Sequence, residues 1–329
     1  MSNFERRHPF SLNLAVSPFT LVSQNKDMGS YPGHVLPGSF FIVFGLWWWC
    51  NIVAIIAQAQ ARFLRKRSFT RRTNNCDFEI EFESRTWCKV PVLCLKRFPV
   101  EPCLKVIAAT IGIMAELTKG EWSLVNKAGH FSHLNNFSHA TMFSIFLLSA
   151  VVEILRFYNI LFLPAATDHV FVSLSFFLVG ELFYFHIDGR SKLDQKLHTL
   201  LYTVSFSIAV VILLEAWQRK SFVLFLTRTF LVLLLGTWFI QIAHVLYGSH
   251  PWKDTDSNRA IIVVTFSWHV LGLLAMLTCS LLLVSVGVKL KRSTCIKPLT
   301  TAGDLPREGR ELDSLMSTEQ GNEELTQID

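Results

Sequence analysis

Residues 222–247 read FVLFLTRTFLVLLLGTWFIQIAHVLY, and this stretch decides the fold class of the chain. It is long enough to cross the hydrocarbon core of a bilayer, which takes about 20 apolar residues. Arg228 is its single formal charge, and two polar side chains, Gln241 and His244, lie near its other end. The stretch therefore predicts a membrane-spanning helix with a polar end.

Six further stretches have the same character. They lie at residues 35–61, 102–118, 138–158, 168–187, 195–217 and 259–288. In the whole chain of 329 residues, 51% are hydrophobic and 17% are charged, an apolar share that is high for a soluble protein. A soluble core explains one buried apolar helix, but not a succession of them with short links. We therefore predict an all-α, multi-pass transmembrane bundle with seven spans, and the lipid bilayer as its first partner.

Charge fixes the expected orientation of this bundle. The segment 62–98 holds ten basic side chains and four acidic ones, so the positive-inside rule places it in the cytoplasm and the N-terminus outside or in the lumen. The second span is the weakest, because Lys105 and Glu116 bracket a short apolar run. If it crosses, seven crossings also place the basic run 289–292 and the C-terminus in the cytoplasm. No basic face with interleaved aromatic residues is present, which argues against a nucleic-acid partner.

The composition divides the chain into three parts. Residues 1–33 have no continuous apolar core and are expected to form a poorly ordered N-terminal extension. Residues 34–290 make the transmembrane domain, and residues 291–329, rich in Gly, Ser and Glu, are expected to be a disordered cytoplasmic tail. The sequence does not distinguish the plasma membrane from an endomembrane.

Ionisable side chains at membrane depth are costly, so they normally face the bundle interior and pair with a partner. Threaded as above, all seven spans contribute a polar group to the lumenal leaflet, beginning with His34 and Glu116. We expect one lumen-facing cavity, partly walled by Trp238, that a larger set of side chains lines. This set is His139, Glu181, His186, Asp194, His198, Gln241, His244, Trp268 and His269.

Spacing along the helices supports a shared face for two pairs. Asp194 and His198 are four residues apart, and Gln241 and His244 are three apart, so each pair projects from one side of its helix. Glu181 and His186 are five apart and share a direction only if the helix ends between them.

A second polar layer lies toward the cytoplasm and consists of Glu153, Glu215 and Arg228. An arginine between two carboxylates in a dry bundle predicts a mutually neutralising cluster. The sequence leaves open whether this cluster only pins the helices or also acts as a gate or relay.

Several segments resemble the transmembrane protein 45 family. They are 33–40 (GHVLPGSF), 44–48 (FGLWW), 139–142 (HATM), 181–186 (ELFYFH) followed by Arg190, 193–195 (LDQ) with His198, 236–242 (GTWFIQI), and 268–269 (WH). The resemblance covers about 33–290, and the longer N-terminus and basic loop favour its transmembrane epididymal branch. It implies a seven-span membrane protein and no established reaction. Where the family tends to have His-x-His, this chain has His186-Ile187-Asp188, which weakens any function that needs both rings.

Two functions are compatible with the histidine layer. The first is a non-enzymatic membrane protein whose cavity binds an ion, a proton or a small ligand. The second is an intramembrane metal-dependent enzyme of the lipid hydrolase type, with Glu181 as candidate general base. Imidazole with carboxylate suits zinc, although no HExxH motif fixes the ligands, and haem is not favoured because no opposed pair is evident. The candidate metal ligands are His139, His186, His198 and His269.

A seven-helix receptor is a remote third alternative, suggested by the number of spans and the outside N-terminus. The third span ends in residues 153–158 (EILRFY), where rhodopsin-like receptors have an adjacent acidic-Arg-Tyr triplet. The seventh span lacks their Asn-Pro-x-x-Tyr motif.

Overall fold

The computed structural model describes residues 29–69, 78, 80–90, 97–160 and 162–295. Most of the extension 1–33 and of the tail 291–329 lies outside the described residues. The described residues form seven helices: α1 (Tyr31–Phe69), α2 (Val100–Lys119), α3 (Leu134–Phe157), α4 (Thr167–Phe185), α5 (Lys192–Trp217), α6 (Phe222–Tyr247) and α7 (Asp256–Cys295). Each apolar stretch of the sequence corresponds to one of them, with α1 and α7 extending further at their C-terminal ends, so the predicted multi-pass helical bundle is confirmed.

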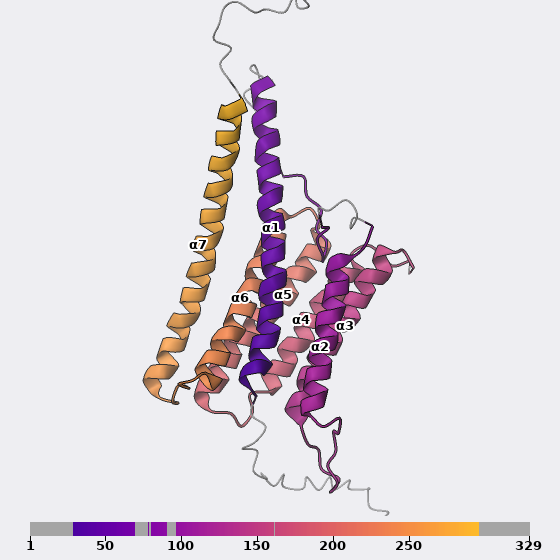
Figure 1. Ribbon diagram of the computed structural model, residues 1–329, viewed down its shortest axis with the longest axis vertical. Coiled ribbons are helices and arrows are strands. Elements are labelled where there is room, and N and C mark those ends of the chain that lie inside the picture. The colour runs from indigo at the N-terminus through magenta and orange to yellow at the C-terminus, as the bar shows by residue number, and fades with distance from the viewer. Residues whose placement is uncertain (1–28, 70–77, 79, 91–96, 161, 296–329) are drawn as a thin grey trace, which may run out of the picture.

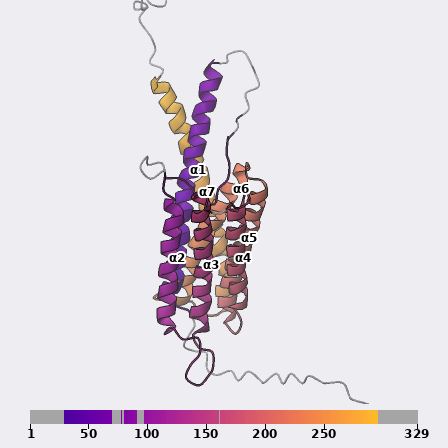
Figure 2. The same ribbon diagram turned by 90° about the vertical axis from the view of Figure 1, so that its right-hand side faces the viewer.

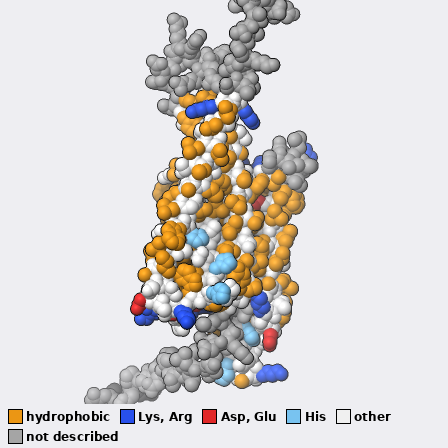
Figure 3. Space-filling view, turned by 60° about the vertical axis from the view of Figure 1, so that its left-hand side comes forward, with side chains coloured by type: hydrophobic (Ala, Val, Ile, Leu, Met, Phe, Trp, Pro, Cys, Tyr) orange, Lys and Arg blue, Asp and Glu red, His pale blue; other side chains and the backbone are white. Residues whose placement is uncertain are grey.

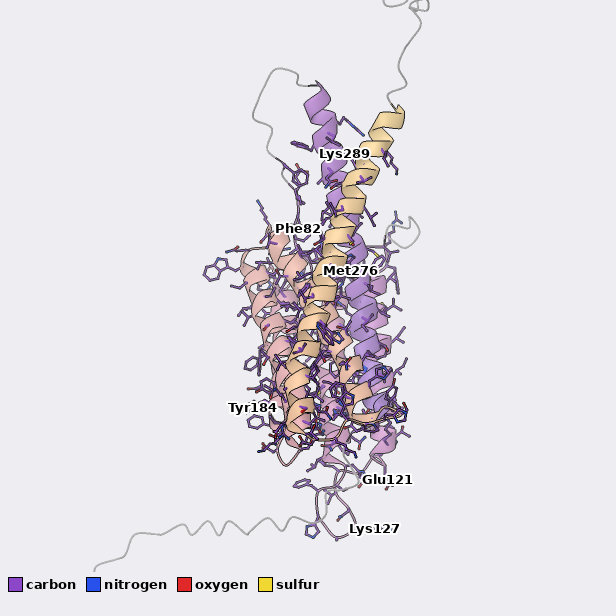
Figure 4. All side chains as sticks on the ribbon, turned by 90° about the vertical axis from the view of Figure 1, so that its left-hand side faces the viewer. Phe82, Glu121, Lys127, Tyr184, Met276 and Lys289 are labelled. Carbon is purple, nitrogen blue, oxygen red and sulfur yellow. The ribbon has the colours of Figure 1, made fainter. Side chains whose placement is uncertain are left out.

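The helices run side by side, and α1 and α7 project together beyond the other five (Figures 1 and 2). We call the end where α1 begins the histidine end and the end where α1 and α7 finish the basic end. The helix α1 continues through Phe69, so the start of the basic segment 62–98 is helical rather than loop. The basic positions that follow both spans therefore lie at the same end of the molecule, where Figure 4 marks Lys289 on α7.

Six of the described helices are long and apolar enough to cross a membrane, and α2 is the exception. Figures 1 and 2 nevertheless show α2 lying along α3 at the edge of the bundle. Its charged side chains Glu101 and Glu116 are buried against other helices, whereas the opposite face is apolar and about half exposed. That face consists of Leu104, Ile107, Ile111 and Met114. Apolar outside and polar inside is the pattern of a span in a membrane, so the composition of α2 does not argue against a seventh crossing.

The centre of the bundle is α6, which packs mainly against α1 on one side and α5 on another. Gly38 of α1 and Gly236 of α6 meet at the first interface, where a Cβ on Gly236 would lie 2.9 Å from the backbone nitrogen of Ile42 and 3.0 Å from the carbonyl oxygen of Gly38. Small residues at helix crossings are typical of membrane bundles because they let two backbones approach closely. The turns before α5 and α6 each end in a cap, since Ser191 and Ser221 accept backbone N–H groups at the starts of α5 and α6.

Hydrophobic side chains cover the flank of the molecule, while lysine and arginine gather toward its ends (Figure 3). On α7, no residue of the most apolar window is buried, and large side chains such as Leu271, Leu282 and Leu283 are exposed. An apolar flank of this extent is the surface that contacts lipid in a membrane protein.

Candidate functional site

Four imidazoles from four parts of the chain form a row at the histidine end. The ring centroid of His139 on α3 lies 5.3 Å from that of His186, which in turn lies 6.0 Å from that of His198 on α5. The row continues to His34 on α1, whose ring centroid is 5.7 Å from that of His198. His186 reaches the row from the C-cap of α4, because the helix ends at Phe185 and the chain turns from His186 onward.

The hydrogen bonds of these rings fix which nitrogen carries the proton. A carbonyl oxygen only accepts, so Nδ1 of His34, 3.1 Å from the carbonyl oxygen of Ser30, is the donor, and Nε2 presents its lone pair when the ring is neutral. The same holds for His198, whose Nδ1 lies 2.6 Å from Oδ1 of Asp194. Arginine only donates, so Nε2 of His186 accepts from Arg190, and its proton is on Nδ1. Among the described residues, no group hydrogen bonds Nε2 of His34 or His198.

Charge at this end is neutralised locally. Arg190 donates from Nη1 to Oδ2 of Asp194 at 2.9 Å, and this pair holds His186 and His198 on either side. A second group surrounds the buried Glu116 of α2. Its carboxylate accepts from Asn136 at 2.8 Å and Lys119 at 3.4 Å, and Nδ1 of His139 lies 3.6 Å from it.

A partly open pocket extends from this row toward the basic end, between α1 on one side and α2, α3 and α4 on the other; its empty space, together with the solvent space that it opens to, is about 1040 Å³. His34 and His139 lie at one end of its lining. Part of its wall is aromatic: the rings of Phe146, Phe176 and Phe239 each contact that of Phe41. A smaller polar pocket of about 490 Å³ shares Gly33 and His139 with it and includes Glu116 and Lys119. The small pocket therefore forms a polar vestibule beside the apolar one.

The far end of the large pocket is formed by Lys105 and Glu153. The ammonium group of Lys105 lies 3.0 Å from Glu101, 3.0 Å from Glu153 and 3.1 Å from the carbonyl oxygen of Thr86, which satisfies its three donors. Glu101 also accepts from the indole nitrogens of Trp47 and Trp48, at 3.0 and 2.8 Å. The far end of the pocket is therefore polar, but its polar groups already have hydrogen-bond partners within the protein.

The structure brings together only part of the set that the sequence placed in one cavity. His139, His186, Asp194 and His198 meet as described. Gln241 and His269 pair with each other at 3.4 Å on the side of α6 that faces α7, and Trp238 packs there too, its ring 5.6 Å from that of His269. The reason is that α6 is apolar on nearly every side, so its sequence does not encode which face turns toward α1.

Three further members of the set lie elsewhere. The exposed His244 contacts Tyr31, with 3.4 Å between Nε2 and the hydroxyl oxygen. Trp268 is 60% exposed and faces away from the bundle, so it does not wall a cavity. Glu181 is half-buried and lines neither pocket, and within the described part of the chain no hydrogen bond or ion pair involves it.

Three of the four candidate metal ligands, His139, His186 and His198, lie in one row, but they do not form a ligand set. His269 is separated from the row, and Nε2 of His186 is occupied by Arg190. In the portion that the structure describes, no group of three or more His, Cys, Asp or Glu side chains is placed to hold a metal ion. The donor set therefore does not fit the zinc site that the sequence left open.

The polar layer toward the basic end is divided between two clusters. Arg228 forms a fully buried ion pair with Glu215, 2.9 Å between Nη1 and Oε2, whereas Glu153 pairs with Lys105. The sequence grouped Glu153 with Arg228 because Lys105 was taken as the edge of a short span rather than as an interior cation. Arg228 also lies over the ring of Trp48, 4.8 Å from its centroid.

One group at this end was not anticipated from the sequence. The segment 80–90 enters the bundle, where Ser84 donates to Glu215 and lies 3.2 Å from Nε2 of His169. Nδ1 of His169 is 3.4 Å from Asp168, which completes a Ser-His-Asp arrangement. Ser84 and His169 have no exposed surface and line neither pocket.

Comparison with known proteins agrees with this architecture. Residues 165–282, from the start of α4 into α7, match a family described as "Family of unknown function (DUF716)". Over 260 residues the chain is 27% identical to mouse transmembrane epididymal protein 1A, covering 74% of this chain and 77% of the mouse protein. The chain is similar to the transmembrane epididymal proteins. This confirms the resemblance expected from its sequence.

The chain is also similar to two proteins named transmembrane epididymal protein 1. The chain is 25% identical over 257 residues to rat transmembrane epididymal protein 1, with 74% of this chain and 77% of the rat protein covered. It is 27% identical over 175 residues to the human protein of that name, with 51% and 61% covered. The match to the family of unknown function includes His186, Asp194 and His198 but excludes α1–α3, which carry His34, His139 and much of the pocket lining.

Proposed function

We propose that this multi-pass membrane protein is a non-enzymatic binding protein for a small amphipathic molecule. The apolar part of the ligand occupies the large pocket, and its polar head lies against His34 and His139. The single observation that supports this proposal is a partly open pocket that has an aromatic wall and imidazoles at one end. Apolar pockets with a few convergent polar groups are typical of small-molecule sites.

The alternative of a metal-dependent lipid hydrolase has less support. It needs a metal ligand set and a general base near the ligand, and Glu181 lies outside the pocket lining. The Ser84 group is likewise sealed from both pockets, so it offers no nucleophile to a bound molecule.

Native mass spectrometry of the purified protein tests the binding function directly. We expect a small molecule bound to the wild-type chain and its loss in Ala109→Phe, because Ala109 is a buried lining residue and the added phenyl ring takes up space that the ligand would occupy. Gly272→Phe is the control for added bulk, because no atom lies within 4 Å of the position of its added Cβ. Equal ligand content in the wild type and Ala109→Phe would show that the pocket is not the binding site.

A further inference from the structure

The charged residues around the large pocket and the helices that border it indicate which chemical class of molecule the pocket binds. We infer that it is an uncharged lipid with a hydroxyl-bearing head, which enters from the bilayer between α1 and α2. The inference rests on the proposed binding function and names its ligand.

The packing of the helices indicates where a lipid would enter the large pocket. The helix α1 packs mainly on α6 and α7, and α2 packs mainly on α3, while direct contact between α1 and α2 is sparse. Both nevertheless supply lining residues, Phe40 and Phe44 from α1 and Ala108 and Ala109 from α2. The outer face of α2 beside this border is the apolar stripe that contacts lipid. A partly open pocket at such a border exchanges its contents with the membrane rather than with water.

The charge of the head follows from the pairing at both ends of the pocket. At the histidine end, the cation of Arg190 is paired with Asp194 and that of Lys119 with Glu116. At the far end, one ammonium group, Lys105, faces two carboxylates, Glu101 and Glu153. An anionic head therefore meets no cation without a partner and meets carboxylates at either end. A cationic head meets no carboxylate that lacks a partner. A charged head would be desolvated without compensation, which is costly in a low-dielectric interior.

The hydrogen-bonding character of the head follows from the imidazoles. Nε2 of His34 presents a lone pair, since its Nδ1 is committed to the Ser30 carbonyl oxygen. His34 is a lining residue that is 4% exposed, and its Nε2 has no hydrogen-bond partner within the described chain. A lone pair at the end of a largely apolar pocket is best satisfied by a donor on the ligand, and the most common uncharged donor of lipid heads is a hydroxyl group. His139, also in the lining, offers the second nitrogen.

The test compares three photoreactive, clickable probes that share one alkyl chain and differ only in the head: a monoglyceride, a free carboxylate and a primary amine. Each is crosslinked to the full-length protein in lipid nanodiscs, and the labelled peptides are identified by mass spectrometry. We expect the monoglyceride probe to label peptides of α1 and α2 at least about tenfold more than the other two. His34→Phe should lower that labelling severalfold, whereas His269→Phe, on the α6–α7 side, should leave it unchanged.

The outcomes separate this inference from the proposed function. If the carboxylate or amine probe labels the pocket as strongly and Ala109→Phe blocks it, the binding function stands and the neutral head is wrong. If no probe labels the pocket, both are wrong. Equal labelling of the wild type and His34→Phe by the monoglyceride probe would remove His34 as the head site. The comparison of heads uses the wild-type chain, so it does not depend on the folding of a variant.

Discussion

Arg228 and Glu215 are the most deeply buried ion pair among the described residues, with side chains 1% and 0% exposed. Removing one partner of such a pair leaves an uncompensated charge in a low-dielectric interior. The same arginine also donates to the carbonyl oxygen of Arg85 at 2.9 Å, so it ties α6 to the segment 80–90.

We therefore predict that Arg228→Leu lowers the free energy of unfolding by about 3–5 kcal/mol. Thermal unfolding of the purified protein in detergent measures this loss, and Glu215→Gln in the same chain should recover part of it. The matched control is Arg62→Leu, because Arg62 faces Glu81 at 3.7 Å with both side chains exposed, and exposed pairs contribute up to about 1 kcal/mol. A wild-type unfolding temperature for Arg228→Leu would contradict the prediction.

At the scale of residues, the sequence predicts contacts within a helix better than contacts between helices. The spacing of Asp194 and His198 is enough to bring them together, because four residues make about one helical turn. The partners Arg190, Lys105 and Ser84 were not assigned to the clusters, since their pairing depends on how each helix is rotated and on where a loop enters the bundle. The sequence of α6 is apolar on nearly all sides, so it does not determine that rotation, and Gln241 turned toward α7.

At the α1–α6 crossing, glycines without side chains allow the two helices to pack closely. Gly236 has no room for a methyl group, because the atoms that it would meet are the backbone nitrogen of Ile42 and the carbonyl oxygen of Gly38. Backbone atoms do not move aside without displacing the whole helix.

We predict that Gly236→Ala lowers the free energy of unfolding by about 1–3 kcal/mol, the usual cost of overpacking. Gly272→Ala is the control on α7, where the added methyl group meets no atom within 4 Å and alanine favours a helix by up to about 1 kcal/mol. Unfolding temperatures of the two variants measure the difference. An equal response of both would mean that the helices do not cross as closely as the structure has them.

The helix α2 shows what hydropathy alone misses. It carries four charged residues, Glu101, Lys105, Glu116 and Lys119, and so is not among the helices that are apolar enough to be recognised as membrane spans from their composition. The sequence supports α2 as a span only indirectly: with α2 there are seven crossings, and both basic segments then lie on the cytoplasmic side. Its structure supplies the physical reason, because Glu101, Lys105 and Glu116 make their ion pairs inside the bundle and the outer stripe is apolar.

At the scale of the whole molecule, the ends of α1 and α7 lie together beyond the bundle, and the α2–α3 loop that carries Lys127 projects from the opposite end (Figure 4). The lysines and arginines that follow both spans would therefore enter one aqueous compartment. By the positive-inside rule we expect this compartment to be the cytoplasm.

Epitope tags at three positions test this orientation: after Phe69, at Lys127, and at the C-terminus. We predict that the tags after Phe69 and at the C-terminus are reached by antibody once the plasma membrane is opened with digitonin, and that the tag at Lys127 lies on the other side of the membrane. The segments carrying Phe69 and Lys127 are separated by α2 alone, so they lie on opposite sides only if α2 crosses. The same accessibility for these two would reduce the protein to six crossings, and the reverse pattern for all three would invert the bundle. In either case the polar vestibule around Glu116 would open to a different compartment from the one that charge predicts.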